Sequence, residues 1–314
     1  MTSCAHIAQN EQLSQIVLPF LKQQDSLTDI NPNHLTFIPL KGGKSQATLY
    51  RFNLNERAYV LRLLPPNADQ LTRTHQITLA TEAGKIGIGP EIYFIDSQLK
   101  GIIMKFIPGR IVQQADFENP NSLLQFVKLL KKLHHSAAKF PLACSPFQRF
   151  NNFLLKGVQN NIVYPPQFAE IIILMKELEK ILELKSMPLV PTHLDLHPSN
   201  IMIENNHFIL VDWVNGGMSD PYFDLATFTT FLNLNDSQVL TFLTHYLERA
   251  PTQFEWNRFI ITKPIRLFVI AAALLTSTTD ETNLQLGLSM LKTGFTISAQ
   301  DEFKVALESL QKND

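Results

Sequence analysis

The sequence predicts an α+β protein of two lobes, a small antiparallel β-sheet lobe followed by a larger and mostly helical lobe. Between about residues 35 and 107, short runs rich in β-branched and aromatic residues alternate with turn signals. From about residue 121 onward, apolar residues recur mainly at helical spacing. Pro108-Gly109 separates the two patterns. We therefore expect an N-terminal lobe at 1–106 and a helical C-terminal lobe at 107–314.

The first lobe is predicted to hold five strands and two helices. Residues 10–25 form a helix that contains Pro19. The stretch "HLTFIPLKGGKSQATLYRFNLNERAYVLRLLPP" reads as a meander of three strands, with turns at Gly42-Gly43 and at 53–55. A helix over 69–86 ends at the turn "GIGP", and the strands "EIYFID" and "GIIMKFI" follow.

The second lobe is predicted to be helical on both sides of one polar loop. The segments "NSLLQFVKLLKKLHHSAA" and "QFAEIIILMKELEKILEL" carry apolar residues at helical spacing, with Lys and Glu on the outer face. Residues from 222 to the end are again helical in pattern. Between them, "VPTHLDLHPSNIMIENNHFILVDW" is predicted to form a loop and a β-hairpin.

Composition excludes several functional classes. The 314 residues are 45% hydrophobic and 18% charged, with a formal net charge of −1, so nothing indicates a nucleic-acid-binding surface. The two cysteines, Cys4 and Cys144, indicate neither a disulfide framework nor a zinc site. The N-terminus does not resemble a signal peptide, and the apolar run at 268–275 is too short to span a bilayer. We expect a cytoplasmic monomer or homodimer that does not insert into membranes.

The polar loop places an Asp, an Asn and another Asp in an apolar neighbourhood. Buried carboxylates are costly unless they are paired or bound to a cation. Pro198 excludes a regular helix or central strand between Asp195 and Asn200. A hairpin with Asn205-Asn206 at its turn would return Asp212 to the side of Asn200. These two oxygen ligands suit Mg²⁺, and Asp195 would accept a hydrogen bond from a hydroxyl.

The motif "HLDLHPSN…LVDW" and the following "GGMSDPYFDLATF" resemble the catalytic segment of the aminoglycoside phosphotransferase and choline/ethanolamine/thiamine kinase-like superfamily. The resemblance runs from about residue 35 to about 230 and is strongest at 193–225. It implies a protein-kinase-like fold with the catalytic loop at 193–200. Asp195 would be the catalytic base, while Asn200 and Asp212 would bind metal beside the nucleotide. His193 and His197 would hold the loop, and Asp224 would brace it.

On the nucleotide side, "LKGGKSQ" is not a P-loop, because the first glycine of that motif would fall on Ile38 and a strand follows where a helix is required. We interpret the segment as a hairpin tip whose backbone approaches phosphates, and the residues concerned are Gly42, Gly43, Lys44 and Ser45. The hinge around Met104 and Phe106 is expected to receive the adenine.

Arg62 in "YVLRL" lies where protein kinases carry a phosphate-binding lysine, and the superfamily resemblance implies the same task for it. The family usually pairs this basic residue with a Glu on the next helix. Here the corresponding position is Gln76, which can donate or accept a hydrogen bond but cannot form an ion pair.

The acceptor is less well specified. Choline-type kinases hold a cation with aromatic faces and carboxylates. The candidates are Trp213, Tyr222, Phe223 and Trp256, with Asp220 as an acidic partner. Val214 stands where the family often has a Glu, and no strongly acidic cleft for an aminoglycoside is visible.

These observations predict an enzyme, an ATP- and Mg²⁺-dependent phosphotransferase that moves the γ-phosphate to a small-molecule hydroxyl and resembles choline, ethanolamine and thiamine kinases. An aminoglycoside-type phosphotransferase and a nucleotide-binding pseudokinase are the main alternatives, the second because of Gln76. A kinase-fold enzyme with a protein acceptor, and a metal site built on the alternating His193, Asp195 and His197, are further alternatives.

Overall fold

The computed structural model describes residues 2–23, 35–40, 47–143, 145–277 and 280–312, with side chains from residue 11 onward except that of Ser277. Cys144 and the predicted phosphate-binding segment at 42–45 lie outside these ranges, as does the side chain of Cys4. The described chain forms two compact units. Unit 1 comprises residues 1–112, 136–141 and 199–214, and unit 2 comprises 113–135, 142–198 and 215–314. The lobe boundary near residue 106 stays a prediction.

Unit 1 contains the predicted five-stranded antiparallel sheet, in the order β1-β2-β3-β5-β4. Its elements are α1 (Thr2–Lys22), β1 (Ile38–Pro39), β2 (Thr48–Leu54), β3 (Arg57–Leu63), α2 (Gln70–Lys85), β4 (Ile92–Ile95), β5 (Gly101–Lys105), β6 (Arg110–Ile111), β8 (Ile201–Glu204) and β9 (His207–Leu210). Strands β6, β8 and β9 form a second, three-stranded sheet. Strand β2 follows the glycine pair, which agrees with the rejection of a P-loop.

Both predicted helices of the first lobe are present. Helix α1 includes Pro19 but begins at Thr2, earlier than expected, because the residues before 10 show no clear apolar period. Helix α2 begins after Asp69, whose carboxylate accepts the N–H of Thr72 at 2.7 Å. It ends before Gly87, whose φ of 66° belongs to the left-handed region.

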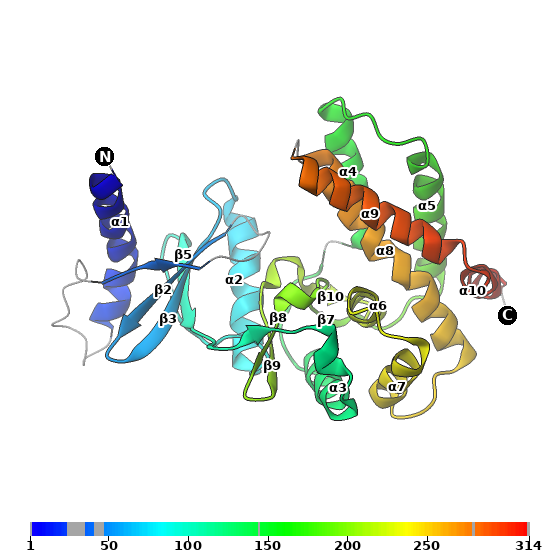
Figure 1. Cartoon of the computed structure of the whole chain (residues 1–314), viewed down its shortest axis with the longest axis horizontal. Helices are drawn as coiled ribbons and strands as arrows, with labels where there is room; N and C mark the ends of the chain where they lie inside the picture. Colours follow the sequence, from blue (N-terminus) through cyan, green and yellow to red (C-terminus); the bar gives the residue numbers. More distant parts are fainter. Residues whose placement is uncertain (1, 24–34, 41–46, 144, 278–279, 313–314) are drawn as a thin grey trace. The chain divides into compact units, whose positions relative to one another are not determined.

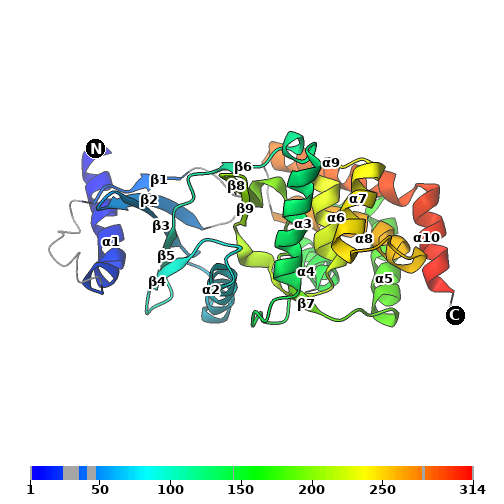
Figure 2. The same ribbon diagram turned by 90° about the horizontal axis from the view of Figure 1, so that it is seen from below.

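The main sheet of unit 1 is covered on both faces (Figures 1 and 2). Apolar residues of α1, among them Val17 and Phe20, pack with Phe52 of β2 and Leu61 of β3. A second cluster joins Leu64, Ile102 and two residues of α2, Ile77 and Ala80. Because side chains alternate along a strand, Arg62 and Leu64 point to the α2 face of the sheet. The alternation of side chains along β3 therefore places the side chain of Arg62 on the face of the sheet that α2 covers.

Unit 2 is built around a long central helix, as Figures 1 and 2 show. Its elements are α3 (Pro120–His134), α4 (Pro146–Gln159), α5 (Phe168–Leu184), β7 (Val190–Thr192), β10 (Gly217–Ser219), α6 (Tyr222–Phe231), α7 (Asp236–Leu247), α8 (Gln253–Ser277), α9 (Glu281–Ser298) and α10 (Asp301–Gln311). Helix α8 contacts α4, α5, α6, α9 and α10. Strands β7 and β10 pair antiparallel on either side of the polar loop in sequence.

Helix α8 also contains one stretch, Gln253–Thr276, whose length and apolar composition would suit a membrane span. Most of it, 72%, is buried inside the fold, as expected for the central helix of a packed domain. The stretch includes Arg258, which is 1% exposed, so α8 carries polar groups into the centre of unit 2.

Candidate active site

The predicted hairpin is present and brings the ends of its two strands together within unit 1. Strands β8 and β9 pair in the register Ile201↔Leu210, and Asn205 and Asn206 at the turn have φ values of 49° and 64°. Two consecutive left-handed residues are typical of a type I′ turn. The N–H of Val211 then donates to the carbonyl of Asn200 at 2.9 Å. Asn200 and Asp212 consequently flank the open end of the hairpin.

Asp212 has an uncommon backbone conformation. Its φ is 60°, in the left-handed region that residues other than glycine seldom adopt. The hairpin is also tied down on its outer side, because the N–H of Leu210 donates to the carbonyl of Ile88 at 2.8 Å. Such strained positions cluster at functional sites, where the surrounding structure fixes them. The hairpin thus holds the carboxylate of Asp212 in a backbone conformation that is typical of functional sites.

Arg62 is the charge partner of Asp212. Its Nη2 donates to Oδ1 of Asp212 at 3.1 Å, and Arg62 is 7% exposed. Among the described residues, Nε of Arg62 and Oε1 of Gln76 are buried without a hydrogen-bond partner. Gln76 is a buried residue of α2, and Arg62 forms its ion pair with Asp212 of the hairpin. A guanidinium prefers a carboxylate over a neutral amide, which explains the difference.

Asp195 lies in unit 2 and uses both of its carboxylate oxygens. Nη2 of Arg266 donates to Oδ1 at 2.5 Å, and Nδ2 of Asn215 donates to Oδ2 at 2.9 Å. Burial by itself would raise the pKa of this carboxyl. The charges of Arg266 and His193 and the two hydrogen bonds outweigh burial, so the pKa of Asp195 lies below its usual value. Asp195 is therefore ionised near neutral pH and can accept a further hydrogen bond.

The loop that carries Asp195 is held by a buried carboxylate. Asp224, at the start of α6, accepts the backbone N–H groups of His193 at 2.8 Å and Leu194 at 2.7 Å. The ring of His134 contacts the same carboxylate at 3.1 Å and the hydroxyl of Tyr246 at 2.7 Å. Leu194 has a φ of 58°, which places both N–H groups on the side of Asp224. The bracing role expected of Asp224 agrees with these contacts.

The other residues predicted for the nucleotide lie in unit 1. Met104 is partly buried on β5 and packs against the cluster that includes Ile77 of α2. Phe106 follows β5, and the guanidinium carbon of Arg51 lies 4.5 Å from the centre of its ring. Phe106 is thus engaged by a cation. The segment Gly42, Gly43, Lys44 and Ser45 falls outside the described residues.

The aromatic residues proposed for a cationic acceptor are divided between the units, with Trp213 in unit 1 and Tyr222, Phe223 and Trp256 in unit 2. Asp220, their expected acidic partner, forms a buried ion pair with Arg258. Trp213 donates to the carbonyl of Leu210 at 3.1 Å inside unit 1. Trp256 donates to Glu302 at 2.9 Å in unit 2. Each of these three polar groups is thus engaged by a residue of its own unit.

Three residues near Asp195 were not identified from the sequence, namely Arg149, Asn215 and Arg266. Arg149 donates to the side-chain oxygen of Asn215 and, at 3.0 Å, to its carbonyl. Arg266 reaches Asp195 across 71 positions of sequence. No local motif could have revealed either arginine, since each comes from a separate helix. Asn215 was detectable only as the polar residue three positions after Asp212.

Sequence analysis left open a metal site built on His193, Asp195 and His197, and the described residues test this alternative. Among them, no group of three or more His, Cys, Asp and Glu residues lies close enough to hold a metal ion. His193, Asp195 and His197 therefore do not form such a group. The ring of His197 packs against Phe231, and the backbone N–H of His197 donates to the carbonyl of Asp195 at 2.8 Å.

The antiparallel sheet, the helical unit and the loop and hairpin between β7 and β10 define a two-lobed protein-kinase-like fold. More particularly, residues 36–258 match the model of the phosphotransferase enzyme family, and the chain belongs to this family. Protein LicA from Haemophilus influenzae is 24% identical over 212 residues, which are 66% of this chain. The match spans 61% of that protein's length.

Solved structures are similar over nearly the whole chain. A choline/ethanolamine kinase family protein from Mesorhizobium loti has a TM-score of 0.77 and 19% identity, covering 95% of this chain and 99% of that one. An ethanolamine kinase from Plasmodium vivax has a TM-score of 0.73 and 16% identity, covering 94% and 89%. The choline kinase LicA from Streptococcus pneumoniae has a TM-score of 0.70 and 16% identity, covering 91% and 99%. At these identities the likeness concerns the fold.

Proposed function

We propose that the protein is an ATP- and Mg²⁺-dependent phosphotransferase that moves the γ-phosphate to a hydroxyl of a small molecule, in the manner of the choline- and ethanolamine-type kinases whose fold it shares. The observation that carries the proposal is the geometry of Asp195, an ionised carboxylate held by a braced loop and supplied with hydrogen-bond donors. Family membership supports the same reaction.

The residues of unit 1 fit the phosphate donor. Asn200 and Asp212 offer the amide and carboxylate oxygens that Mg²⁺ accepts from proteins. Nε of Arg62 and Oε1 of Gln76, both buried and unpartnered among the described residues, leave donor and acceptor capacity for a polar ligand. When bound, Mg²⁺ would neutralise charge on the phosphates. Arg62 would orient the same phosphates through its planar guanidinium.

Asp195 supplies the chemistry on the acceptor. It accepts the proton of the hydroxyl as the oxygen bonds to the γ-phosphorus, the bond from that phosphorus to ADP breaks, and the products are a phosphate monoester and ADP. Because the transition state is loose, positioning contributes more than basicity, and a carboxylate of lowered pKa suffices. Asn215 and Arg266 fix the direction of the carboxylate, and Asp224 fixes the loop.

An ADP-release assay tests the proposal directly. Purified protein would be incubated with Mg-ATP and a panel of choline, ethanolamine, thiamine, aminoglycosides, sugars, amino alcohols and hydroxy acids, with Asp195→Asn as the blank. We expect acceptor-dependent ADP release that the variant loses. Release that is equal in wild type and variant would refute the role of Asp195.

The pseudokinase alternative rests on Gln76, which cannot form an ion pair with Arg62. In the structure Arg62 already pairs with Asp212, so it does not depend on position 76 for a counter-charge. The aminoglycoside alternative calls for a strongly acidic acceptor site. A shift in melting temperature with Mg-ATP but no transfer to any acceptor would favour the pseudokinase, and ADP release specific to aminoglycosides would favour the other.

A further inference from the structure

The bracing carboxylate of Asp224 is itself held by two residues that take no part in the proposed chemistry, His134 and Tyr246. His134 is the last residue of α3, and Tyr246 belongs to α7. Nε2 of His134 lies 3.1 Å from Oδ2 of Asp224, and its Nδ1 lies 2.7 Å from the hydroxyl of Tyr246. The side chains of His134 and Asp224 are fully buried, and Tyr246 is 9% exposed. These three side chains form one hydrogen-bonded row inside unit 2, the Tyr246–His134–Asp224 row.

The direction of each hydrogen bond in this row follows from the groups that form it. A carboxylate only accepts, so Nε2 of His134 must carry a hydrogen and donate to Asp224. Burial raises the pKa of the Tyr246 hydroxyl and the charge of Asp224 raises it further, so Tyr246 keeps its proton. Among the described residues, this hydroxyl has His134 as its one hydrogen-bond partner. Tyr246 therefore donates to Nδ1, and the ring of His134 is neutral with its hydrogen on Nε2.

A second buried tyrosine of unit 2 shows that the fold tolerates a tyrosine hydroxyl without a partner. Tyr222 is 2% exposed, and among the described residues its hydroxyl is buried and makes no hydrogen bond. The hydroxyl of Tyr246, by contrast, contacts the ring that holds Asp224. The two tyrosines therefore offer a matched comparison, one with and one without a hydrogen bond that leads to the catalytic loop.

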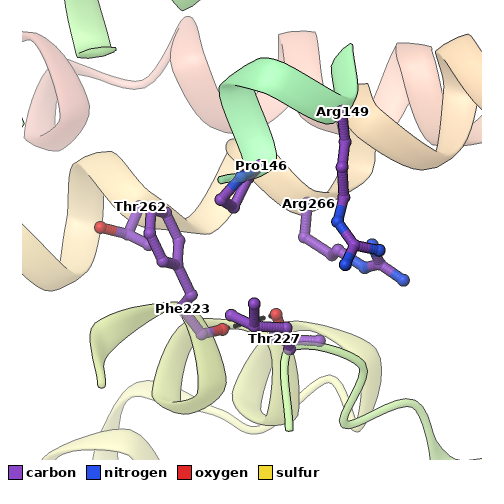
Figure 3. Close-up of a pocket in the computed structure, with 7 residues that line it drawn as sticks. Pro146, Arg149, Phe223, Thr227, Thr262 and Arg266 are labelled. Atoms are coloured by element: carbon purple, nitrogen blue, oxygen red, sulfur yellow. Dashed lines mark hydrogen bonds between the residues drawn. The ribbon is translucent and has the colours of Figure 1, made fainter. Parts of the chain in front are cut away.

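The helix that carries Asp224 is closely packed on the side that bears Phe223 and Thr227. Figure 3 shows these two residues of α6 directed toward residues of α4 and α8. The pocket among them has a volume of about 10 Å³, which is room for about one water molecule. Thr227 also donates to the carbonyl of Phe223 at 2.6 Å. The backbone of α6 therefore has little room to shift, and the freedom that remains to Asp224 is rotation of its carboxylate.

Rotation of this carboxylate would release the catalytic loop. Oδ1 of Asp224 accepts the N–H of Leu194, and Oδ2 accepts that of His193, so each oxygen has its own loop partner. The hydrogen bond from His134 to Oδ2 adds a third contact, which fixes the oxygen that faces each N–H group. Because Asp195 directly follows Leu194, the direction of the Asp224 carboxylate influences where the loop places Asp195.

We propose that His134 and Tyr246 are positioning residues of the catalytic loop, with Tyr246 fixing the ring of His134 and His134 fixing the carboxylate of Asp224. The inference rests on the phosphotransferase function proposed above, and it adds two residues to those that prepare Asp195 for the acceptor. Both act through Asp224. Loss of one hydrogen bond of the row should loosen the loop by the contribution of a single buried hydrogen bond, which corresponds to about a three- to tenfold change.

Two tyrosine variants of the full chain test the inference. Tyr246→Phe removes the hydroxyl that contacts His134, and the control Tyr222→Phe removes a hydroxyl that makes no hydrogen bond among the described residues. Tyr246→Phe should speed the solvent exchange of the backbone N–H groups of His193 and Leu194 by about three- to tenfold, and the control should leave it unchanged. Hydrogen exchange followed by NMR would measure these rates, with N–H groups of α5 as the reference for opening of the whole protein.

Nitrogen NMR of the histidine rings tests the assigned hydrogens directly. Near neutral pH the ring of His134 should show a protonated Nε2 and an unprotonated Nδ1, and His134→Gln identifies its signals by their loss. A ring with hydrogens on both nitrogens, or on Nδ1 alone, would overturn the inference, because Tyr246 could then not donate to it.

Kinetics with Mg-ATP connect the row to the proposed reaction. Tyr246→Phe should lower kcat by about three- to tenfold and leave KM for ATP unchanged, because the row lies in unit 2 and the donor is assigned to unit 1. His134→Leu should also lower kcat. His134→Gln should recover part of that loss, because its side-chain amide can donate to Asp224 as Nε2 does.

The outcomes separate this inference from the proposed function. If the protein transfers phosphate and Tyr246→Phe changes neither kcat nor the exchange of the loop N–H groups, the positioning role is refuted while the phosphotransferase stands. If the exchange responds as expected and no acceptor is phosphorylated, the row holds the loop and the enzyme is refuted. Exchange that rises equally in the loop and in α5 would show that Tyr246 only stabilises the fold, which would also overturn the inference.

Discussion

Each unit contains an arginine paired with a carboxylate that we propose to be functional, and the two pairs differ in how the chain builds them. In unit 1, Arg62 of β3 meets Asp212 at 3.1 Å, and Asp212 follows a short hairpin. In unit 2, Arg266 of α8 meets Asp195 at 2.5 Å, and Asp195 lies in a loop braced by α6. The first pair joins a sheet to a hairpin, whereas the second joins a loop to the central helix.

We expect the two pairs to serve different substrates, the pair of unit 1 the phosphate donor and the pair of unit 2 the acceptor. The donor-side pair, Arg62 and Asp212, lies wholly inside residues 36–258, the stretch that matches the family model. In the acceptor-side pair only Asp195 lies inside this stretch, because Arg266 follows it in the sequence. We therefore expect Arg62 to act on the phosphate donor that the family shares, and Arg266, through Asp195, to act on the acceptor.

The largest effect is expected at the carboxylate of unit 2. Asp195→Asn should lower kcat by about 10²–10⁴-fold, because the amide cannot accept the hydroxyl proton. KM for ATP should change little, since the donor is assigned to unit 1. Steady-state kinetics with an identified acceptor would measure both constants. A loss that appears only in KM would contradict the assignment of Asp195.

The second-largest effect should distinguish Arg62 from Arg266 by the substrate whose kcat/KM each variant lowers. Arg266→Gln should lower kcat/KM for the acceptor by about 10–100-fold and Arg62→Gln that for ATP by a similar factor, as expected for hydrogen bonds to charged groups. Initial rates measured while one substrate is varied at a time would resolve the two. Equal effects of both variants on both substrates would remove the division between donor-side and acceptor-side pairs.

A third effect concerns stability of the loop. Asp224→Asn should destabilise the protein by about 1–3 kcal/mol, because one amide oxygen replaces two carboxylate oxygens that accept buried N–H groups. Urea unfolding would measure it. Asp69→Asn is a suitable control, since asparagine caps helices about as well as aspartate at this exposed N-cap. Equal stability of both variants would show that Asp224 does not brace the loop.

The smallest effect is on pH dependence. Since the charges and hydrogen bonds around Asp195 hold its pKa below the usual range, it stays ionised until the pH falls through that lowered pKa. Activity should therefore decline only at strongly acidic pH. Arg266→Gln removes the main lowering charge, so the acidic limb of kcat/KM should move to higher pH. A limb that stays in place would mean that another group controls it.

The sequence predicted most of unit 1 and the loop because their signals are local. The strand at "YVLRL", the helix over 69–86 and the Asn205-Asn206 turn were each predicted from a few neighbouring residues. The hairpin then placed Asn200 near Asp212 by strand pairing alone. Strand and turn chemistry of this kind is short-ranged, so it can be read without tertiary information.

The acceptor side could not be predicted in the same way. Arg266 meets Asp195 across 71 positions and Arg149 meets Asn215 across 66, so both contacts depend on how helices pack. Asp220 looked available for a cation, but Arg258 of α8 occupies it. Tertiary structure determines which residue pairs with a buried charge, and helical periodicity in the sequence does not reveal that partner.

The most direct test of the account is phosphorus NMR of a reaction containing the full chain, Mg-ATP and the acceptor panel of the ADP-release assay, run beside Asp195→Asn. The account predicts a new phosphate monoester signal that grows in equal amount to ADP in wild type and is absent from the variant. ADP accompanied only by inorganic phosphate, or no consumption of ATP with any acceptor, would contradict it.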